Sequence, residues 1–250
     1  MLYDQAIFHP AGARSLVMEF GDGIEPVINA RIRLMAKAIE TSEEIEIDEI
    51  IPTYRSIQIF YSPLTIDVAE LIEQLRAIEA ALPEDAGSDY RIVSIPTVYG
   101  GDFGPDLEHV AEHNGLTPEE VIRIHTGTDY LLYMLGFTPG FSYLGGMSET
   151  IATPRLLKPR VKIPAGSVGI AGSQTGVYPI DSPGGWQLIG RTPLKMYDPL
   201  AETPVLLKAG DYVRFVAIDQ AEYEAIEQQV AQGTYQVSIE QGGELNHGDD

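Results

Sequence analysis

The 250-residue sequence predicts an α+β fold in two parts, a small ferredoxin-like domain over residues 1–90 and a β-barrel domain over residues 91–235. Two helical patterns alternate with strand patterns over the first part, as in a split β-α-β motif. After Asp129, short β-type runs follow one another with glycine and proline between them, which favours an antiparallel barrel or sandwich. The polar tail over residues 236–250 is expected to be disordered.

The spacing of apolar residues predicts the elements of the N-terminal domain. Ile28, Ile32, Met35 and Ile39 recur at helical spacing, and Asp67 is a suitable N-cap for a second helix. The expected elements are a strand over 15–20, a helix over 27–40, strands over 45–51 and 56–61, a helix over 67–82 and a strand over 91–98. Their order, β-α-β-β-α-β, is that of the ferredoxin-like motif.

The second part begins with helices and continues with short strands. Thr117, Pro118 and Glu120 form the signature of a capping box, which places a helix start at Pro118. The expected elements are helices over 107–114 and 118–125, strands over 130–135, 167–171, 186–189, 194–197 and 212–217, and a last helix over 221–231. Strands this short, without long helices between them, favour a barrel.

Composition excludes several classes of function. The formal net charge of −21 repels phosphate backbones, so we expect binding neither to nucleic acid nor to an anionic membrane. Cysteine is absent, which excludes disulfides, thiolate metal ligands and a cysteine nucleophile. No signal peptide and no run of about 18 apolar residues is visible, so we expect a cytoplasmic globular protein.

One segment departs from this acidic background. Residues 137–197 hold 10 of the 25 glycines and 7 of the 17 prolines, with six basic residues and only two acidic ones. Grouped like charges are tolerated where they bind an anionic ligand or an acidic partner, and pairing with acids from elsewhere in the fold is an equal alternative. The six basic residues are Arg155, Lys158, Arg160, Lys162, Arg191 and Lys195.

Sequence motifs for metal and nucleotide chemistry are weak. His109, Glu112 and His113 match a His-x-x-Glu-His zinc pattern, but no third ligand or long helix accompanies them, so we expect no metal site. The glycine-rich segment 166–172 lacks the Gly-Lys-Ser/Thr of a phosphate-binding loop. His125 ends a predicted helix, where a cationic helix cap is the simpler interpretation and a catalytic base the alternative.

The glycine-rich turns also carry polar and aromatic side chains, which favours a binding site built on loops. Glycine permits positive φ and close approach of a ligand, while aromatic rings supply rigid apolar walls. A purely structural barrel also needs tight turns, but it seldom needs Gln, Thr, Tyr and Trp within them. The candidate binding residues in these turns are Phe137, Phe141, Tyr143, Gly166, Ser167, Gln174, Thr175, Tyr178, Gly184, Gly185 and Trp186.

Ordered blocks in the second part resemble the KipI/PxpB family, also called allophanate hydrolase subunit 1. The blocks are GFTPGFSYLGG at 136–146, PRL at 154–156, PR at 159–160, IPAGSVGIAG at 163–172, QTGVYP at 174–179, SPGGW at 182–186 and IGRTP at 189–193. The resemblance extends from Phe20-Gly21-Asp22 to the end of the predicted barrel. It implies a cyclophilin-like barrel as the second domain.

The resemblance also implies a function, that of the B subunit in an ATP-dependent 5-oxoprolinase. This hydrolase opens the lactam of 5-oxoproline to L-glutamate, with ATP and its Mg²⁺ as cosubstrate and no permanently bound cofactor. The protein is expected to work in a hetero-oligomer with A-type and C-type subunits, the latter related to allophanate hydrolase subunit 2, and to be inactive alone. Other relatives imply two alternatives, an inhibitor of a sporulation histidine kinase and a subunit related to urea carboxylase.

The substrate that the resemblance implies is an anion, and so is its phosphorylated form. We therefore expect Arg155, Arg160, Lys162 and Arg191 to converge on one cleft around it. Backbone N–H groups around Gly166 and Ser167, or around Gly184 and Gly185, are expected to stabilise a developing oxyanion.

The candidate catalytic residues are Asp181 and His125, each as a group that handles protons. A hydrogen-bonding role suits Asp181 at least as well. Because the sequence shows no nucleophile and no phosphate-binding loop, we expect a composite site that a partner completes.

Overall fold

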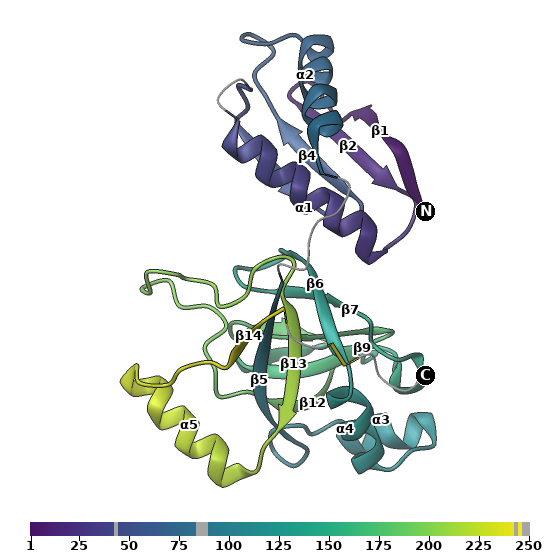
Figure 1. Cartoon of the computed structure of the whole chain (residues 1–250). Helices are drawn as coiled ribbons and strands as arrows, with labels where there is room; N and C mark the ends of the chain where they lie inside the picture. The colour runs from purple at the N-terminus through teal and green to yellow at the C-terminus, as the bar shows by residue number, and fades with distance from the viewer. Residues whose placement is uncertain (43–44, 84–89, 243–244, 247–250) are drawn as a thin grey trace. The chain divides into compact units, whose positions relative to one another are not determined.

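The protein is described by a computed structural model over residues 1–42, 45–83, 90–242 and 245–246. It divides into two compact units, Met1–Asp89 and Tyr90–Asp250 (Figure 1). Each unit has its own hydrophobic core. The fold is mixed α/β, with few helices and a large sheet in the second unit that nearly closes into a barrel.

The N-terminal unit consists of an antiparallel sheet and two helices (Figure 1). Its elements are β1 (Leu2–Pro10), β2 (Ser15–Gly21), α1 (Pro26–Thr41), β3 (Glu49–Pro52), β4 (Ser56–Phe60) and α2 (Val68–Ala81), with sheet order β1-β2-β4-β3. The predicted apolar stripe of α1 is buried, since Ile28, Ile32 and Met35 are 0% exposed. Asp67 caps α2 as predicted, because its carboxylate accepts a hydrogen bond from the Ala69 N–H at 2.8 Å.

The predicted ferredoxin-like order is wrong in its first and last strands. The observed order is β-β-α-β-β-α, because the strand Leu2–Pro10 precedes the predicted elements and the strand predicted over 91–98 belongs to the second unit. The edge strand β1 buries only Ala6 and contains an irregularity between Leu2 and Ile7, so its sequence shows no clean alternation. A pattern search based on one buried face cannot find such a strand.

The second unit contains the barrel. Its elements are β5 (Arg91–Tyr99), α3 (Leu107–Asn114), α4 (Pro118–Thr126), β6 (Asp129–Leu135), β7 (Ser142–Gly145), a 3₁₀ turn (Glu149–Ile151), β8 (Arg160–Ile163), β9 (Ser167–Ala171), β10 (Gln174–Val177), β11 (Ser182–Gly184), β12 (Gln187–Arg191), β13 (Tyr212–Ala217), α5 (Gln220–Gln232) and β14 (Ile239–Gln241). The main sheet runs β10-β9-β12-β5-β13-β6-β7, and β10 lies against β7, so the sheet almost closes. Figure 1 shows α3 and α4 together at one end of these strands.

Most of the predicted elements of this unit are confirmed, including α3, α4 and α5 and the capping box at Thr117 and Glu120. The strand predicted over 194–197 is wrong, since only Tyr197 forms an isolated bridge there, with Val205. Buried Leu194 and Met196 produce the alternation, but the segment packs into the core without a neighbouring strand.

The prediction of a disordered tail over 236–250 is wrong for β14, which pairs with Arg91–Val93 of β5. The strands β12 and β14 pair with the same edge of β5. Because β12 pairs only with Val98 and Tyr99, the backbone groups at the start of β5 are left for β14 to pair with. Residues 243–244 and 247–250 lie outside the described residues.

Candidate functional site

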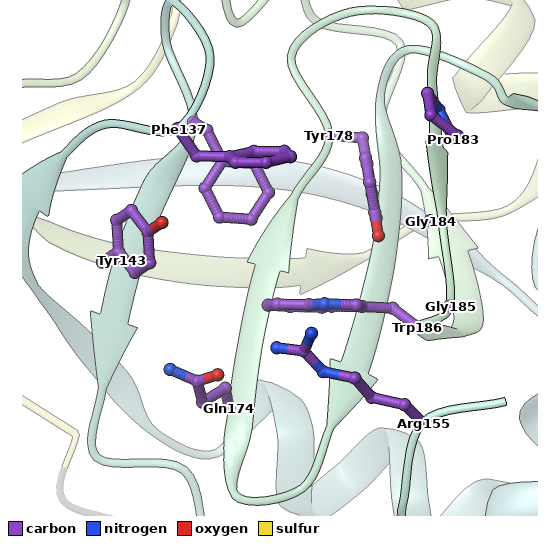
Figure 2. A pocket seen from close by; sticks show the side chains of 10 residues that line it. Phe137, Tyr143, Arg155, Gln174, Tyr178, Pro183, Gly184, Gly185 and Trp186 are labelled. Atoms are coloured by element: carbon purple, nitrogen blue, oxygen red, sulfur yellow. The ribbon is translucent and has the colours of Figure 1, made fainter. Parts of the chain in front are cut away.

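The candidate site is a pocket of about 200 Å³ on the barrel, between loops that are distant in sequence (Figure 2). Its walls come from the β6–β7 loop and β7, from β10 and the turn after it, from β11 and the residues that follow, and from the loop before β8. The lining residues are Phe137, Phe141, Tyr143, Arg155, Gln174, Tyr178, Pro183, Gly184, Gly185 and Trp186.

Aromatic rings form the rigid part of this pocket. Phe141 is central, with its ring centroid 5.3–5.9 Å from those of Phe137, Tyr143, Tyr178 and Trp186, each in an edge-on arrangement. Edge-to-face packing is the favoured geometry for aromatic pairs, so the rings hold one another in place. Phe141, Tyr178 and Trp186 are themselves buried, which makes the walls part of a small core.

The local backbone explains why glycine is needed in this pocket. A Cβ atom on Gly184 would lie 2.4 Å from the hydroxyl oxygen of Tyr178, so only glycine lets β11 pass so close to that ring. Phe137 adopts a positive φ of 63°, which is uncommon outside glycine, and its side chain is 75% exposed. Conformations of this kind concentrate at binding sites.

The polar side chains of the pocket are a guanidinium group, a carboxamide and tyrosine hydroxyls, all of which can donate hydrogen bonds. The Arg155 guanidinium carbon lies 5.9 Å from the centre of the Trp186 ring, and Figure 2 shows the guanidinium beside the indole, with the Gln174 amide close by. Burial raises the pKa of Tyr178, and the charge of Arg155 partly offsets that effect, so its hydroxyl stays protonated near neutral pH. The lining contains no carboxylate. The pocket therefore suits a small, flat anion.

The expected convergence of the four basic residues on one cleft is wrong. Only Arg155 lines the pocket. Arg160 donates to an Asp106 carboxylate oxygen at 2.7 Å and to the Trp186 carbonyl at 3.2 Å. The Lys162 ammonium lies 2.7 Å from Asp181, and Arg191 lies over the Phe103 ring at 5.7 Å. Pairing with acids from elsewhere in the fold, the alternative left open on charge, is correct for Arg160 and Lys162.

Asp181 lies outside the pocket, in a wider hollow of about 490 Å³ that Tyr223 and Glu227 also line. Its carboxylate accepts a hydrogen bond from the Ala165 N–H at 2.8 Å and is paired with the Lys162 ammonium. The Lys162 ammonium, and then the Ala165 N–H, lower the pKa of Asp181. The carboxylate is therefore ionised and weakly basic, so its position supports the hydrogen-bonding role.

His125 is buried in the barrel and makes no contribution to the pocket surface. Its Nδ1 lies 2.8 Å from the Tyr99 hydroxyl, and its Nε2 lies 2.7 Å from Thr175 Oγ1. Because the Thr175 hydroxyl donates to the Gly169 carbonyl, it accepts the proton of His125 Nε2, and Nδ1 accepts from Tyr99. Burial lowers the pKa of His125 to about 3, so the ring is neutral near pH 7 and is not a cationic helix cap.

Three other candidate residues lie outside the pocket, and the structure gives partners to the backbone N–H groups of two of them and to the side chain of the third. The Gly166 N–H donates to the Tyr178 carbonyl at 2.7 Å, and the Ser167 N–H donates to the Pro164 carbonyl at 3.2 Å. Neither N–H is available to an oxyanion, so that expectation fails at 166–167, and Thr175 belongs to the His125 network.

Sequence reasoning misses one lining residue, Pro183, although its block at 182–186 carries other candidates. The nine other lining residues are all candidates. Seven are aromatic or glycine residues of the turns that build the walls, Gln174 belongs to the same turns, and Arg155 is a candidate because of its charge.

Two further observations concern the part of the chain that the structure describes. Within it, no three His, Asp or Glu side chains are placed to hold a metal ion, and the His109 and His113 rings lie with centroids 6.2 Å apart. Within the same residues, no helix is long and apolar enough to cross a bilayer.

Comparison with known proteins gives consistent relatives. The family model for the carboxyltransferase domain, subdomain C and D, matches residues 6–207. The 5-oxoprolinase B subunit of Bacillus subtilis is 47% identical over 87% of this chain and 95% of its own length. That of Escherichia coli O157:H7 is 41% identical, over 82% of this chain and 93% of its own length.

Solved structures agree on the fold. A conserved uncharacterized protein of Pyrococcus horikoshii is 49% identical, with a TM-score of 0.53, over 87% of this chain and 100% of that chain. The urea carboxylase of Kluyveromyces lactis is 20% identical, with a TM-score of 0.75, over 96% of this chain and 25% of that chain. The second likeness shows a shared fold, that of a carboxyltransferase domain.

Proposed function

The chain belongs to the family of 5-oxoprolinase B subunits, and we propose on this basis that it serves as that subunit in an ATP-dependent 5-oxoprolinase. The observation that carries the proposal is the identity of 41–47% to proteins of this name, over most of both chains. The enzyme opens the lactam of 5-oxoproline to L-glutamate. A protein of this kind requires other subunits, so we propose that A-type and C-type subunits complete the complex, in the cytoplasm where ATP is supplied, and that this chain is inactive alone.

We place 5-oxoproline in the aromatic pocket. Arg155 offers the guanidinium that a carboxylate prefers, and the Gln174 amide offers a donor and an acceptor, which match the N–H and C=O of a lactam. The rings of Phe141 and Trp186 supply flat apolar walls for a five-membered ring. The small volume of about 200 Å³ fits a small acid better than a nucleotide.

The ATP step belongs to another part of the complex in this proposal. A lactam is a poor electrophile, so transfer of a phosphoryl group from ATP to its oxygen creates a leaving group. Water then attacks the carbon, and cleavage of the C–N bond releases the amine and leaves an acyl phosphate. A second water hydrolyses this acyl phosphate to the γ-carboxylate of L-glutamate and free phosphate. The Mg²⁺ that accompanies ATP prefers oxygen ligands, carboxylates above all, and the pocket lining contains no carboxylate. The role of this chain is therefore to bind and orient the lactam.

The test is steady-state kinetics of the complex reconstituted with Arg155→Ala. A lost charge-assisted hydrogen bond costs about 1.5–3 kcal/mol, so KM for 5-oxoproline should rise roughly 10- to 150-fold. Lys195→Ala is the matched control, because Lys195 belongs to the same basic segment but pairs with Asp198 outside the pocket. Wild-type kinetics for Arg155→Ala would place the substrate elsewhere, and a wild-type complex without 5-oxoproline-dependent ATP hydrolysis would refute the function.

A further inference from the structure

The rim segment, residues 154–163, exposes large apolar side chains beside the pocket. Leu157 is 106% exposed and Val161 is 91% exposed. Single exposed leucines are ordinary on a protein surface, and Leu64 and Leu200, each 95% exposed, are examples elsewhere in this chain. The rim segment differs from them in its rigidity and its charge.

Contacts with the barrel hold the rim segment in one conformation. The Leu156 N–H donates to the Gly185 carbonyl at 2.7 Å, and the Gln187 side-chain amide donates to the Pro154 carbonyl at 2.8 Å. At its other end the segment pairs as β8 with β11. Leu157 and Val161 are therefore presented by ordered backbone. Because this surface is already ordered, less conformational entropy is lost when a partner binds to it.

The charge of the rim segment is opposite to that of the whole chain. It contains four basic residues and no acidic one, on a protein with a net charge of −21. Asp106 and Asp181 neutralise Arg160 and Lys162. Among the residues that the structure describes, no carboxylate lies within ion-pair distance of Arg155 or Lys158. An occupant of this surface would gain both apolar burial and charge complementarity.

We propose that the rim segment is the docking surface for another protein of the 5-oxoprolinase complex, through a face of that partner that is acidic and receives Leu157 and Val161. The proposal rests on the proposed function. A second copy of this chain, packed by a two-fold axis, would set two basic segments against each other, which disfavours it as the occupant. Because Arg155 belongs both to the rim segment and to the pocket, the docked partner lies next to the bound substrate.

The experiment measures binding of the other two proteins of the complex to purified chain variants at low and high salt. Leu157→Asp and Val161→Asp should each weaken binding at least about tenfold, as expected for central anchors of an interface. Lys158→Glu should weaken it mainly at low salt, because salt screens the attraction. Leu200→Asp and Leu64→Asp are the matched controls, since both leucines are equally exposed and lie outside the rim segment. Leu157 is fully exposed, so its replacement should leave the thermal midpoint unchanged.

Three outcomes overturn the proposal: wild-type affinity for both rim variants, an equal loss for Leu200→Asp, or no binding by the wild-type chain. Self-association of the chain alone that Leu157→Asp abolishes would identify a second copy as the occupant instead. The proposed function fails separately, when the wild-type complex assembles yet shows no 5-oxoproline-dependent ATP hydrolysis.

Discussion

At the scale of single residues, the polar side chains of the barrel are sorted by burial. His125 and Thr175 belong to a buried chain of hydrogen bonds in which each donated proton has one acceptor. Arg155 and Gln174, by contrast, face the pocket. Gln174 and Thr175 are neighbours on β10, so the Thr175 side chain points into the barrel and the Gln174 side chain faces the pocket. Side-chain alternation along a strand produces this division.

The buried His125 predicts a specific dependence of stability on pH. Its pKa is about 3 in the folded protein and 6.5 when unperturbed, so between these values the unfolded chain binds a proton that the folded chain does not. Stability should therefore fall as pH decreases through this range, by about 1.4 kcal/mol per pH unit below about 6. Urea unfolding at pH 7, 6 and 5 measures the effect as the difference between wild type and His125→Asn.

The exposed His109 supplies the control for that experiment. His109→Asn makes the same substitution at an exposed histidine and is unfolded at the same three pH values. A constant difference between wild type and His125→Asn at all three pH values would contradict the prediction.

At the scale of elements, local sequence signals predict helices better than edge strands. The capping box at Thr117 and Glu120 is confirmed, because it depends on residues three apart in the chain. The edge strand β1 escapes prediction, because a strand that buries one residue has no periodic signature. The strand predicted over 194–197 fails for the opposite reason, since alternation is present there without a partner strand.

The cap of α4 gives the prediction at this scale. Thr117→Ala removes the hydroxyl that accepts a hydrogen bond from the Glu120 N–H at 3.2 Å. The free energy of unfolding should fall by about 1 kcal/mol, measured in urea, whereas Thr117→Ser should stay within about 0.5 kcal/mol of wild type. Equal stability of the two variants would show that the cap does not contribute.

At the scale of the whole molecule, ion pairs with buried carboxylates join segments of the second unit that are distant in sequence. Arg91 at the start of β5 makes a two-pronged pair with Asp211, 120 residues later, and Asp211 is 1% exposed. Arg214 pairs in the same way with Asp129, 85 residues earlier. The Asn246 N–H also donates to Asp129, so the C-terminal segment is held at the same place.

Breaking one such pair should be far more costly than breaking a surface pair. Arg91→Met leaves the Asp211 carboxylate buried without its partner, which typically costs about 3–5 kcal/mol of stability. Lys195→Met breaks the exposed pair with Asp198 and should cost at most about 1 kcal/mol. Chemical unfolding of both variants gives the comparison, and equal losses would mean that the Arg91 pair is not held out of water.

Signals between near neighbours in the chain are enough to predict the helices with the caps at Asp67 and Thr117, the barrel-type pattern of the second part, and nine of the ten residues that line the pocket. Periodicity, capping and the choice of glycine and aromatic residues in turns all involve residues that are close together in the chain, so the sequence alone predicts them. Three features become visible only in the folded chain: which cations are paired, the burial and neutrality of His125, and the entry of Arg155 alone into the pocket. Arg160 meets Asp106 across 54 residues, and a contact of that range is set by how the strands pack rather than by any local pattern.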